Sequence, residues 1–257
     1  MMCLSPPGLP AEAALFLDVD GTLLELAPRP ELVRVPAELP ALLARLSRQR
    51  AGALALISGR PLAQLDRLFR PWRGAASGLH GGEWRHADGT VERAGAGEAD
   101  RAAAAALDAI RPALGELQRD DGRLLLEDKG GTVALHYRAA PEREAEIRAA
   151  AEQLRRRAGQ SLRVIAGKMV VEFQPAHRDK GAAVSAFLQE APFQGRLPVF
   201  LGDDVTDEDA FAEVNRRGGH SVRIGEPAET AARYRLPSVS AALDWLGGRR
   251  GGNPQGR

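Results

Sequence analysis

The sequence has few of the features that mark secreted, membrane or nucleic-acid-binding proteins. It contains a single cysteine, so no disulfide can form within the chain. No apolar run approaches the ~20 residues that a membrane-spanning helix needs. The 35 basic and 34 acidic side chains nearly cancel, whereas a dedicated nucleic-acid binder needs a basic excess to meet phosphates. We therefore expect a cytoplasmic protein that has no nucleic-acid or membrane partner and, with no extra interface element visible, is a monomer.

Short apolar runs alternate with helical patterns in the first part of the chain. Residues 13–17 and 53–57 are apolar runs of the length expected for buried parallel strands. Residues 36–49 place leucines on one helical face, and Ser58 is expected to cap the helix that follows it. This order of strand, helix, strand and helix predicts a parallel sheet with helical crossovers.

The pattern changes between residues 98 and 174. The expected elements there are a helix, two strands, a helix and two strands, at 98–119, 123–127, 132–138, 141–158, 162–165 and 168–174. This αββαββ order predicts an antiparallel sheet with two helices on one face. We therefore expect a core domain formed by residues 1–97 and 175–247, an inserted α/β domain at residues 98–174, and a disordered tail at residues 248–257.

The parallel pattern resumes after the insertion, and three predicted strands of the core end in polar residues. The expected helices lie at 180–189, 207–216 and 239–246, and the expected strands at 198–201 and 221–224. Polar residues follow the strands as Asp18-Val19-Asp20-Gly21-Thr22, as Ser58 and as Asp203-Asp204, and Lys180 begins a helix. Because ligands of open parallel sheets bind beyond the carboxyl ends of the strands, these groups are expected to converge there.

The chemistry of these groups favours phosphoryl transfer. Clustered carboxylates repel one another and need a cation, and all-oxygen ligation points to Mg²⁺, which also accepts substrate phosphate. Lysine and serine beside the metal bind phosphate oxygens. One aspartate can attack phosphorus, and a second aspartate two residues on can protonate the leaving alcohol and then deprotonate water.

Each feature also has an ordinary structural interpretation. The Asp18 segment is also compatible with a simple turn, but not with a calcium loop, because Gly21 is the fourth residue and a strand precedes it. Ser58 is suited to capping a helix, and Lys180 to a solvated helix surface. Favourable charge at a helix N-terminus explains the acids from Asp207 onward, but it does not explain Asp203 and Asp204 at the strand end. The joint occurrence of all these groups at strand and helix ends is far more specific than any one of them.

The same residues resemble the motifs of the haloacid dehalogenase (HAD) superfamily, and in particular of the trehalose-6-phosphate phosphatase family. The superfamily motifs correspond to Asp18-Val19-Asp20-Gly21-Thr22, Ser58, Lys180 and Gly202-Asp203-Asp204. The narrower resemblance rests on Ser58-Gly59-Arg60, Gly78-Leu79-His80-Gly81, Ala134-Leu135-His136-Tyr137-Arg138, Gly167-Lys168-Met169-Val170-Val171-Glu172 and Gly202-Asp203-Asp204-Val205-Thr206-Asp207-Glu208. It covers roughly residues 13–246. One departure is the charged triplet His177-Arg178-Asp179 before Lys180.

The resemblance implies a Rossmann-like core with a C2-type α/β cap, and an enzyme that hydrolyses trehalose 6-phosphate through an aspartyl phosphate with Mg²⁺. It implies Asp18 as the nucleophile and Asp20 as the general acid and base. The metal ligands would be Asp18, Asp203 and the backbone carbonyl of Asp20, supported by Thr22, Asp204 and Asp207. The phosphate and substrate contacts would come from Asp20, Ser58, Gly59, Arg60 and Lys180.

The inserted domain is expected to bind the sugar through polar contacts. Its candidate polar residues are Glu127, Lys129, His136, Arg138, Lys168 and Glu172, of which Lys129, Lys168 and Glu172 are favoured. Alternatives remain open: another HAD sugar-phosphate phosphatase, such as a sucrose-phosphate or mannosylglycerate-pathway enzyme; a phospho-accepting receiver module; and an inactive sugar-binding domain. The short length of receiver modules, and the competent residue at every motif position, argue against the last two.

Overall fold

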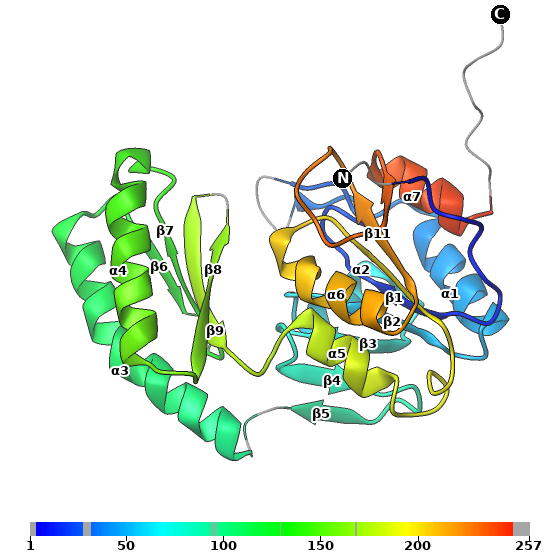
Figure 1. The fold of residues 1–257 in the computed structure, drawn as a ribbon, viewed down its shortest axis with the longest axis horizontal. Helices are drawn as coiled ribbons and strands as arrows, with labels where there is room; N and C mark the ends of the chain where they lie inside the picture. The colour runs from blue at the N-terminus through cyan, green and yellow to red at the C-terminus, as the bar shows by residue number, and fades with distance from the viewer. Residues whose placement is uncertain are drawn as a thin grey trace, which may run out of the picture. The chain divides into compact units, whose positions relative to one another are not determined.

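The computed structural model of the protein describes residues 4–27, 32–93, 95, 97–128, 130–167 and 169–248. The chain forms two compact units (Figure 1). The first unit consists of residues 1–93 and 179–257, and the second of residues 94–178. The insertion expected from the sequence spanned residues 98–174. Most of the predicted tail, from residue 249 onward, lies outside the described residues.

The first unit is built around an eight-stranded sheet in the order β12-β11-β10-β1-β2-β3-β4-β5. Six strands are parallel: β1 (Ala14–Leu17), β2 (Leu54–Ile57), β3 (Ala75–Gly78), β10 (Pro198–Gly202), β11 (His220–Ile224) and β12 (Tyr234–Leu236). The strand β4 (Glu83–Arg85) pairs antiparallel with β3, and the edge strand β5 (Val91–Arg93) pairs antiparallel with β4. The crossover between β1 and β10 places Asp18 and Asp203 after neighbouring strand ends.

Helices cover both faces of this sheet because its central strands are apolar on both sides. On one face, Leu15 and Leu17 pack in a cluster with α1 (Leu39–Gln49), α2 (Leu62–Leu68) and α7 (Val239–Leu246). On the other face, Ala14 and Phe16 pack with α5 (Lys180–Phe187) and α6 (Glu208–Arg216). The residues of β1 therefore alternate between two fully buried layers, as the pleat of a strand requires.

The structure corrects two expectations about helix beginnings. Ser58 does not cap a helix: α2 begins at Leu62 with Pro61 at its N-cap, and the Ser58 Oγ accepts a hydrogen bond from the Arg60 N–H at 3.1 Å. The first helix begins at Leu39 rather than at residue 36. In both cases a proline lies in or beside the first turn, where its missing N–H costs no hydrogen bond.

The second unit is a four-stranded antiparallel sheet covered by two helices (Figure 1). Its strand order is β6-β7-β9-β8. The strands are β6 (Leu125–Asp128), β7 (Val133–His136), β8 (Leu162–Gly167) and β9 (Val170–Pro175), and the helices are α3 (Glu98–Asp120) and α4 (Glu144–Arg157). Val133, Leu135, Val171 and Phe173 form one buried core with apolar residues of both helices. The predicted αββαββ order is therefore the observed one, with a short 3₁₀ turn (η2, Pro141–Arg143) before α4.

The two ends of the second unit are joined to each other by one carboxylate. Asp100, in the first turn of α3, accepts hydrogen bonds from the Gly95 N–H at 2.9 Å and from the His177 ring at 2.8 Å. The Arg178 guanidinium also donates to Asp100, through its Nε at 3.1 Å and through a second nitrogen. The charged triplet that departs from the family pattern thus supplies two partners to Asp100.

No helix among the described residues has both the length and the apolar character needed to cross a membrane.

Candidate active site

Four charged side chains meet at the carboxyl edge of the core sheet. The Lys180 Nζ, at the first residue of α5, lies 2.7 Å from Oδ1 of Asp18 and 2.6 Å from Oδ1 of Asp207. One ligand oxygen from each of Asp18, Asp203 and Asp207 lies within 4.8 Å of the other two. Residues from distant parts of the sequence thus form one acidic cluster around a single buried ammonium group.

Burial and mutual repulsion shape the ionisation of this cluster. Burial is the main cause that raises the pKa of Asp18 and of Asp203 above the ordinary value, and neighbouring carboxylates raise both further. Burial alone would lower the pKa of Lys180, but the ion pairs with Asp18 and Asp207 outweigh it, so that this pKa is raised. Lys180 therefore stays charged, and the raised pKa values of Asp18 and Asp203 mean that one ammonium group does not fully compensate the carboxylates around it.

The Asp207 side chain holds the turn after β10 in place. This side chain is fully buried, and its Oδ2 accepts hydrogen bonds from the backbone N–H groups of Asp203 at 2.8 Å and Asp204 at 2.9 Å. Asp204, which is exposed, completes a capping box with Asp207 at a 3₁₀ turn (η3, Val205–Asp207). A Cβ on Gly202 would stand 2.3 Å from the Asp207 Cγ, so glycine is needed there for this carboxylate to fold back.

The loop after β1 is shaped to meet Asp203. Gly21 has a φ of 81°, and a Cβ at this position would lie 2.0 Å from the Asp203 carboxylate. The buried hydroxyl of Thr22 donates to Oδ1 of Asp203 at 3.4 Å. The backbone N–H groups of Leu23 and Leu24 both donate to the Val19 carbonyl, which closes the turn. The Asp-x-Asp-Gly-Thr sequence thus both closes its own turn and makes room and a hydrogen bond for Asp203 at the end of the neighbouring strand.

The loop after β2 brings Ser58, Gly59 and Arg60 to the same edge of the sheet. Ser58 is buried, and Gly59 has no room for a Cβ because the His80 ring would lie 2.5 Å from it. The Arg60 guanidinium binds both carboxylate oxygens of Asp20, through Nε at 2.7 Å and through NH2 at 2.6 Å.

The sugar-reading residues expected in the second unit are only partly described. Glu172 lies on β9, and its Oε1 accepts a hydrogen bond from the Thr132 hydroxyl at 2.8 Å. His136 and Glu127 face each other across β7 and β6, with 3.0 Å between Nε2 and Oε2. Lys129 and Lys168 lie outside the described residues.

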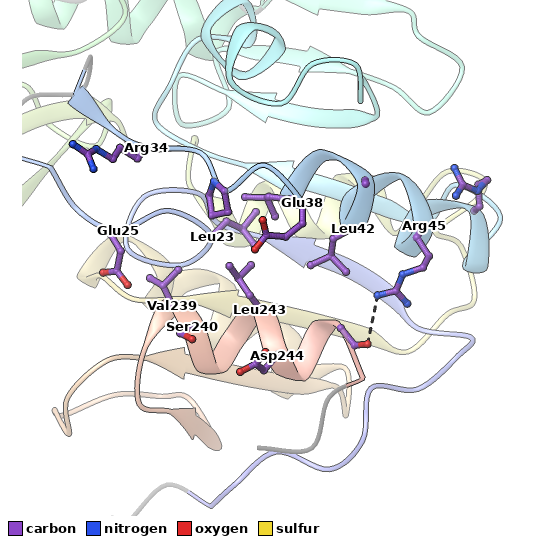
Figure 2. A pocket seen from close by; sticks show the side chains of 15 residues that line it. Leu23, Glu25, Arg34, Glu38, Leu42, Arg45, Val239, Ser240, Leu243 and Asp244 are labelled. Carbon is purple, nitrogen blue, oxygen red and sulfur yellow. Dashed lines mark hydrogen bonds between the residues drawn. The ribbon is translucent and has the colours of Figure 1, made fainter. Parts of the chain in front are cut away.

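The core also has a hollow between α1 and α7 that does not include the acidic cluster (Figure 2). Its volume is about 640 Å³. Leu42 and Leu243 lie among its apolar side chains, and Arg45 donates to the Gly247 carbonyl at its rim. Leu23 of the Asp-x-Asp-Gly-Thr loop lines it too, so the hollow lies behind that loop.

Two features of the site were not evident from the sequence. The place of Asp207 within the cluster was expected only as a supporting one, although its carboxylate oxygen lies as close as the others. Arg60 was expected among the phosphate or substrate contacts, and the structure adds an ion pair between its guanidinium and Asp20 that the sequence did not indicate. No local pattern indicates either contact, because Arg60 and Asp20 lie 40 positions apart and Lys180 and Asp207 lie 27 apart.

The parallel core sheet, the acidic cluster at its carboxyl edge and the inserted α/β unit together define a HAD-like fold. A solved structure titled as the trehalose-6-phosphate phosphatase C-terminal domain of C. albicans shares this fold. It matches with a TM-score of 0.74 at 21% identity, over 92% of this chain and 91% of that one.

The chain belongs to the trehalose-phosphatase family, whose profile matches residues 16–240, and it is a phosphoric monoester hydrolase. A probable trehalose-phosphate phosphatase of Sinorhizobium fredii is 46% identical over 89% of this chain and 84% of its own length. The trehalose-6-phosphate phosphatase of Escherichia coli is 43% identical over 93% of this chain and 87% of its own length.

Proposed function

We propose that this protein hydrolyses trehalose 6-phosphate to trehalose and phosphate, through an aspartyl phosphate on Asp18 and with Mg²⁺. The observation that carries the proposal is the convergence of Asp18, Asp203 and Asp207 around Lys180 at the edge of the sheet. The names of the two relatives above support trehalose 6-phosphate as the substrate.

The acidic cluster fits a divalent cation of hard character. Its donors are all oxygens, and their mutual repulsion, which raises the pKa of Asp18 and Asp203 in addition to burial, is relieved by positive charge. Asp18 and Asp203 would hold Mg²⁺ through their carboxylates and Asp20 through its backbone carbonyl. Asp207 supports them, because its oxygens already accept three donors. When bound, the ion neutralises charge on the phosphoryl oxygens.

Asp18 and Asp20 divide the chemistry between them. In the first step an Asp18 oxygen bonds to phosphorus, the bond from phosphorus to the sugar oxygen breaks, and Asp20 gives that oxygen a proton. In the second step Asp20 takes a proton from water, the water oxygen bonds to phosphorus, and the bond to Asp18 breaks. The products are trehalose and phosphate, and both aspartates return to their starting states.

Ser58 and Lys180 hold the phosphoryl group in this scheme. The Ser58 oxygen accepts from the Arg60 N–H, which leaves its own O–H proton to donate to a phosphoryl oxygen. Lys180 has three N–H donors, of which two go to Asp18 and Asp207, so one remains for the substrate. Gly59 lets the loop approach closely. For the sugar hydroxyls we propose Glu172, together with Lys129 and Lys168.

The decisive experiment is a panel of sugar phosphates, measured as phosphate release with Mg²⁺ and with a chelator. We expect turnover to be fastest on trehalose 6-phosphate and to stop when the metal is removed. Faster turnover on sucrose 6-phosphate or a mannosylglycerate phosphate would assign the protein to another sugar-phosphate phosphatase.

The nucleophile is tested separately with Asp18→Asn, which keeps the volume of the side chain but removes its charge. We expect activity to fall below about one thousandth of wild type, in the range of losses seen when catalytic groups are removed. Thermal unfolding of the same variant checks that the fold is kept. Retention of more than a few per cent of activity would exclude Asp18 from this role.

A further inference from the structure

Asp20 and Arg60 form a two-pronged ion pair beside the acidic cluster. Both carboxylate oxygens are engaged, at 2.6 and 2.7 Å, in the parallel geometry that makes arginine–carboxylate pairs strong and directional. Arg60 as a whole is 9% exposed, whereas 33% of the Asp20 side chain is exposed. The cation is therefore anchored in the protein, while the carboxylate it holds remains accessible to a substrate.

The fold fixes Arg60 at both its backbone and its side chain. Its N–H donates to Ser58 Oγ at 3.1 Å, and its carbonyl accepts from the Leu79 N–H at 3.2 Å. Gly78 permits this contact, because a Cβ there would stand 2.8 Å from the Arg60 carbonyl. Further out, the guanidinium NH1 donates to Oε1 of Gln64 at 3.2 Å on α2. Arg60 is thus held rigidly enough to impose one orientation on the carboxylate.

We propose that Arg60 is a positioning residue that acts through Asp20, rather than a ligand of the phosphoryl group. This inference rests on the proposed function, in which Asp20 gives a proton to the departing sugar oxygen. Proton transfer requires the donor and acceptor atoms to lie within hydrogen-bond reach, and errors of about 1 Å in such placement cost large factors in rate. Because Arg60 occupies the lone pairs of the Asp20 oxygens that face its guanidinium, the proton must lie on an outward-facing lone pair, and the fixed plane of the carboxyl group determines where that proton is delivered.

The distinguishing consequence concerns the leaving group. A sugar alcohol is a poor leaving group and needs a proton as it departs, whereas 4-nitrophenolate departs readily without one. In the first step, a residue that positions the proton donor therefore matters for the sugar ester and little for the aryl ester; the second step, hydrolysis of the aspartyl phosphate, is common to both. A residue that binds the phosphoryl group matters equally for both, because the two substrates share that group.

The test compares the kinetics of Arg60→Lys on trehalose 6-phosphate and on 4-nitrophenyl phosphate. Lysine keeps the charge but cannot form the two-pronged contact. We expect kcat/KM on trehalose 6-phosphate, which reports the steps up to departure of the alcohol, to fall about 10²-fold, at the lower end of what general acid catalysis contributes. On the aryl ester we expect kcat/KM to change less than about fivefold. Activity on the aryl ester also reports that the variant is folded.

Two further variants complete the design. Arg67→Lys, at an exposed position of α2, is the matched control and should leave both activities unchanged. In an Asp20→Asn background, Arg60→Lys should add no further loss, because its partner no longer carries the proton.

The outcomes that overturn the inference are distinct. Equal losses of kcat/KM on both esters, or a rise in KM on both, would make Arg60 a phosphate ligand. A gain of activity in Arg60→Lys would show that the ion pair between Arg60 and Asp20 holds Asp20 back from catalysis instead of positioning it. If the wild-type protein hydrolysed the aryl ester but not trehalose 6-phosphate, the proposed function would fail instead.

Discussion

The two units of this protein differ in where their ion pairs lie: buried in the core and exposed on the second unit. In the core, the Lys180 side chain is 5% exposed and contacts Asp18 and Asp207, which are equally buried. In the second unit, Glu152 on α4 pairs with Arg155 and Arg156, and all three side chains face solvent. Buried charges depend on one another because removing one leaves its partners uncompensated in a medium of low polarity. Exposed charges are already solvated, so each is nearly independent of its neighbours.

This contrast predicts that the largest effect will come from Lys180→Met. We expect the free energy of unfolding to fall by about 3–5 kcal/mol, because two buried carboxylates lose their shared cation. The kcat for phosphate release should fall about 10³-fold or more. Urea unfolding and steady-state kinetics measure the two effects. Arg155→Met on α4 is the matched control and should change the free energy of unfolding and kcat by little. Similar losses in the two variants would contradict the difference between buried and exposed charges.

A smaller effect is expected from filling the space over the Asp207 carboxylate. Gly202→Ala places a methyl group 2.3 Å from the Asp207 Cγ, so the carboxylate must shift and weaken its bonds to the turn and to Lys180. We expect a loss of about 1–3 kcal/mol in the free energy of unfolding, together with reduced activity.

A glycine-to-alanine change in the second unit is expected to have the opposite effect on stability. Gly115 lies inside α3, and a Cβ there would meet the end of the Arg119 side chain at an ordinary distance of 3.5 Å. Gly115→Ala should therefore stabilise the protein by about 0.5–1 kcal/mol, through helix propensity alone. Thermal unfolding of both variants gives the comparison, and stabilisation by Gly202→Ala would contradict the assigned packing of Asp207.

Asp100 departs from the pattern of exposed ion pairs within the second unit, because its side chain is only 14% exposed and joins the two ends of the unit. Partial burial alone would raise its pKa, but hydrogen bonds from Arg178, His177 and Gly95 lower it to about 2, from an ordinary 3.8. Because the folded state favours the carboxylate, its stabilising contribution is present above pH 3.8 and is lost as the pH falls towards about 2.

We therefore expect Asp100→Asn to cost about 2 kcal/mol near neutral pH, as the loss of hydrogen bonds to a charged group does. The difference from wild type should narrow as the pH falls through this window. Urea unfolding as a function of pH measures it, and the exposed Glu152→Gln, expected to cost less than about 0.5 kcal/mol, is the control. A difference that is constant with pH would show that the Asp100 charge plays no part.

The sequence predicts much of the fold, and the elements it misses have a physical reason. The strong apolar runs at β1, β2 and β10 and the αββαββ order of the second unit are evident from local pattern. The strands β3 (Ala-Ala-Ser-Gly) and β12 (Tyr-Arg-Leu) are not, because each is short and lacks β-branched residues. Their places are fixed by pairing with neighbouring strands, which no local window contains.

What the sequence alone determined is the inventory of chemical groups and the strand and helix ends that carry them, since apolar periodicity and motif spacing are local properties. What only the tertiary structure decided is which groups face one another. Asp18 meets Lys180 across 162 positions, Asp207 folds back onto the turn at Asp203, and Arg60 turns to Asp20. Such contacts depend on the order of strands in the sheet, which brings distant residues together and gives each side chain its partner.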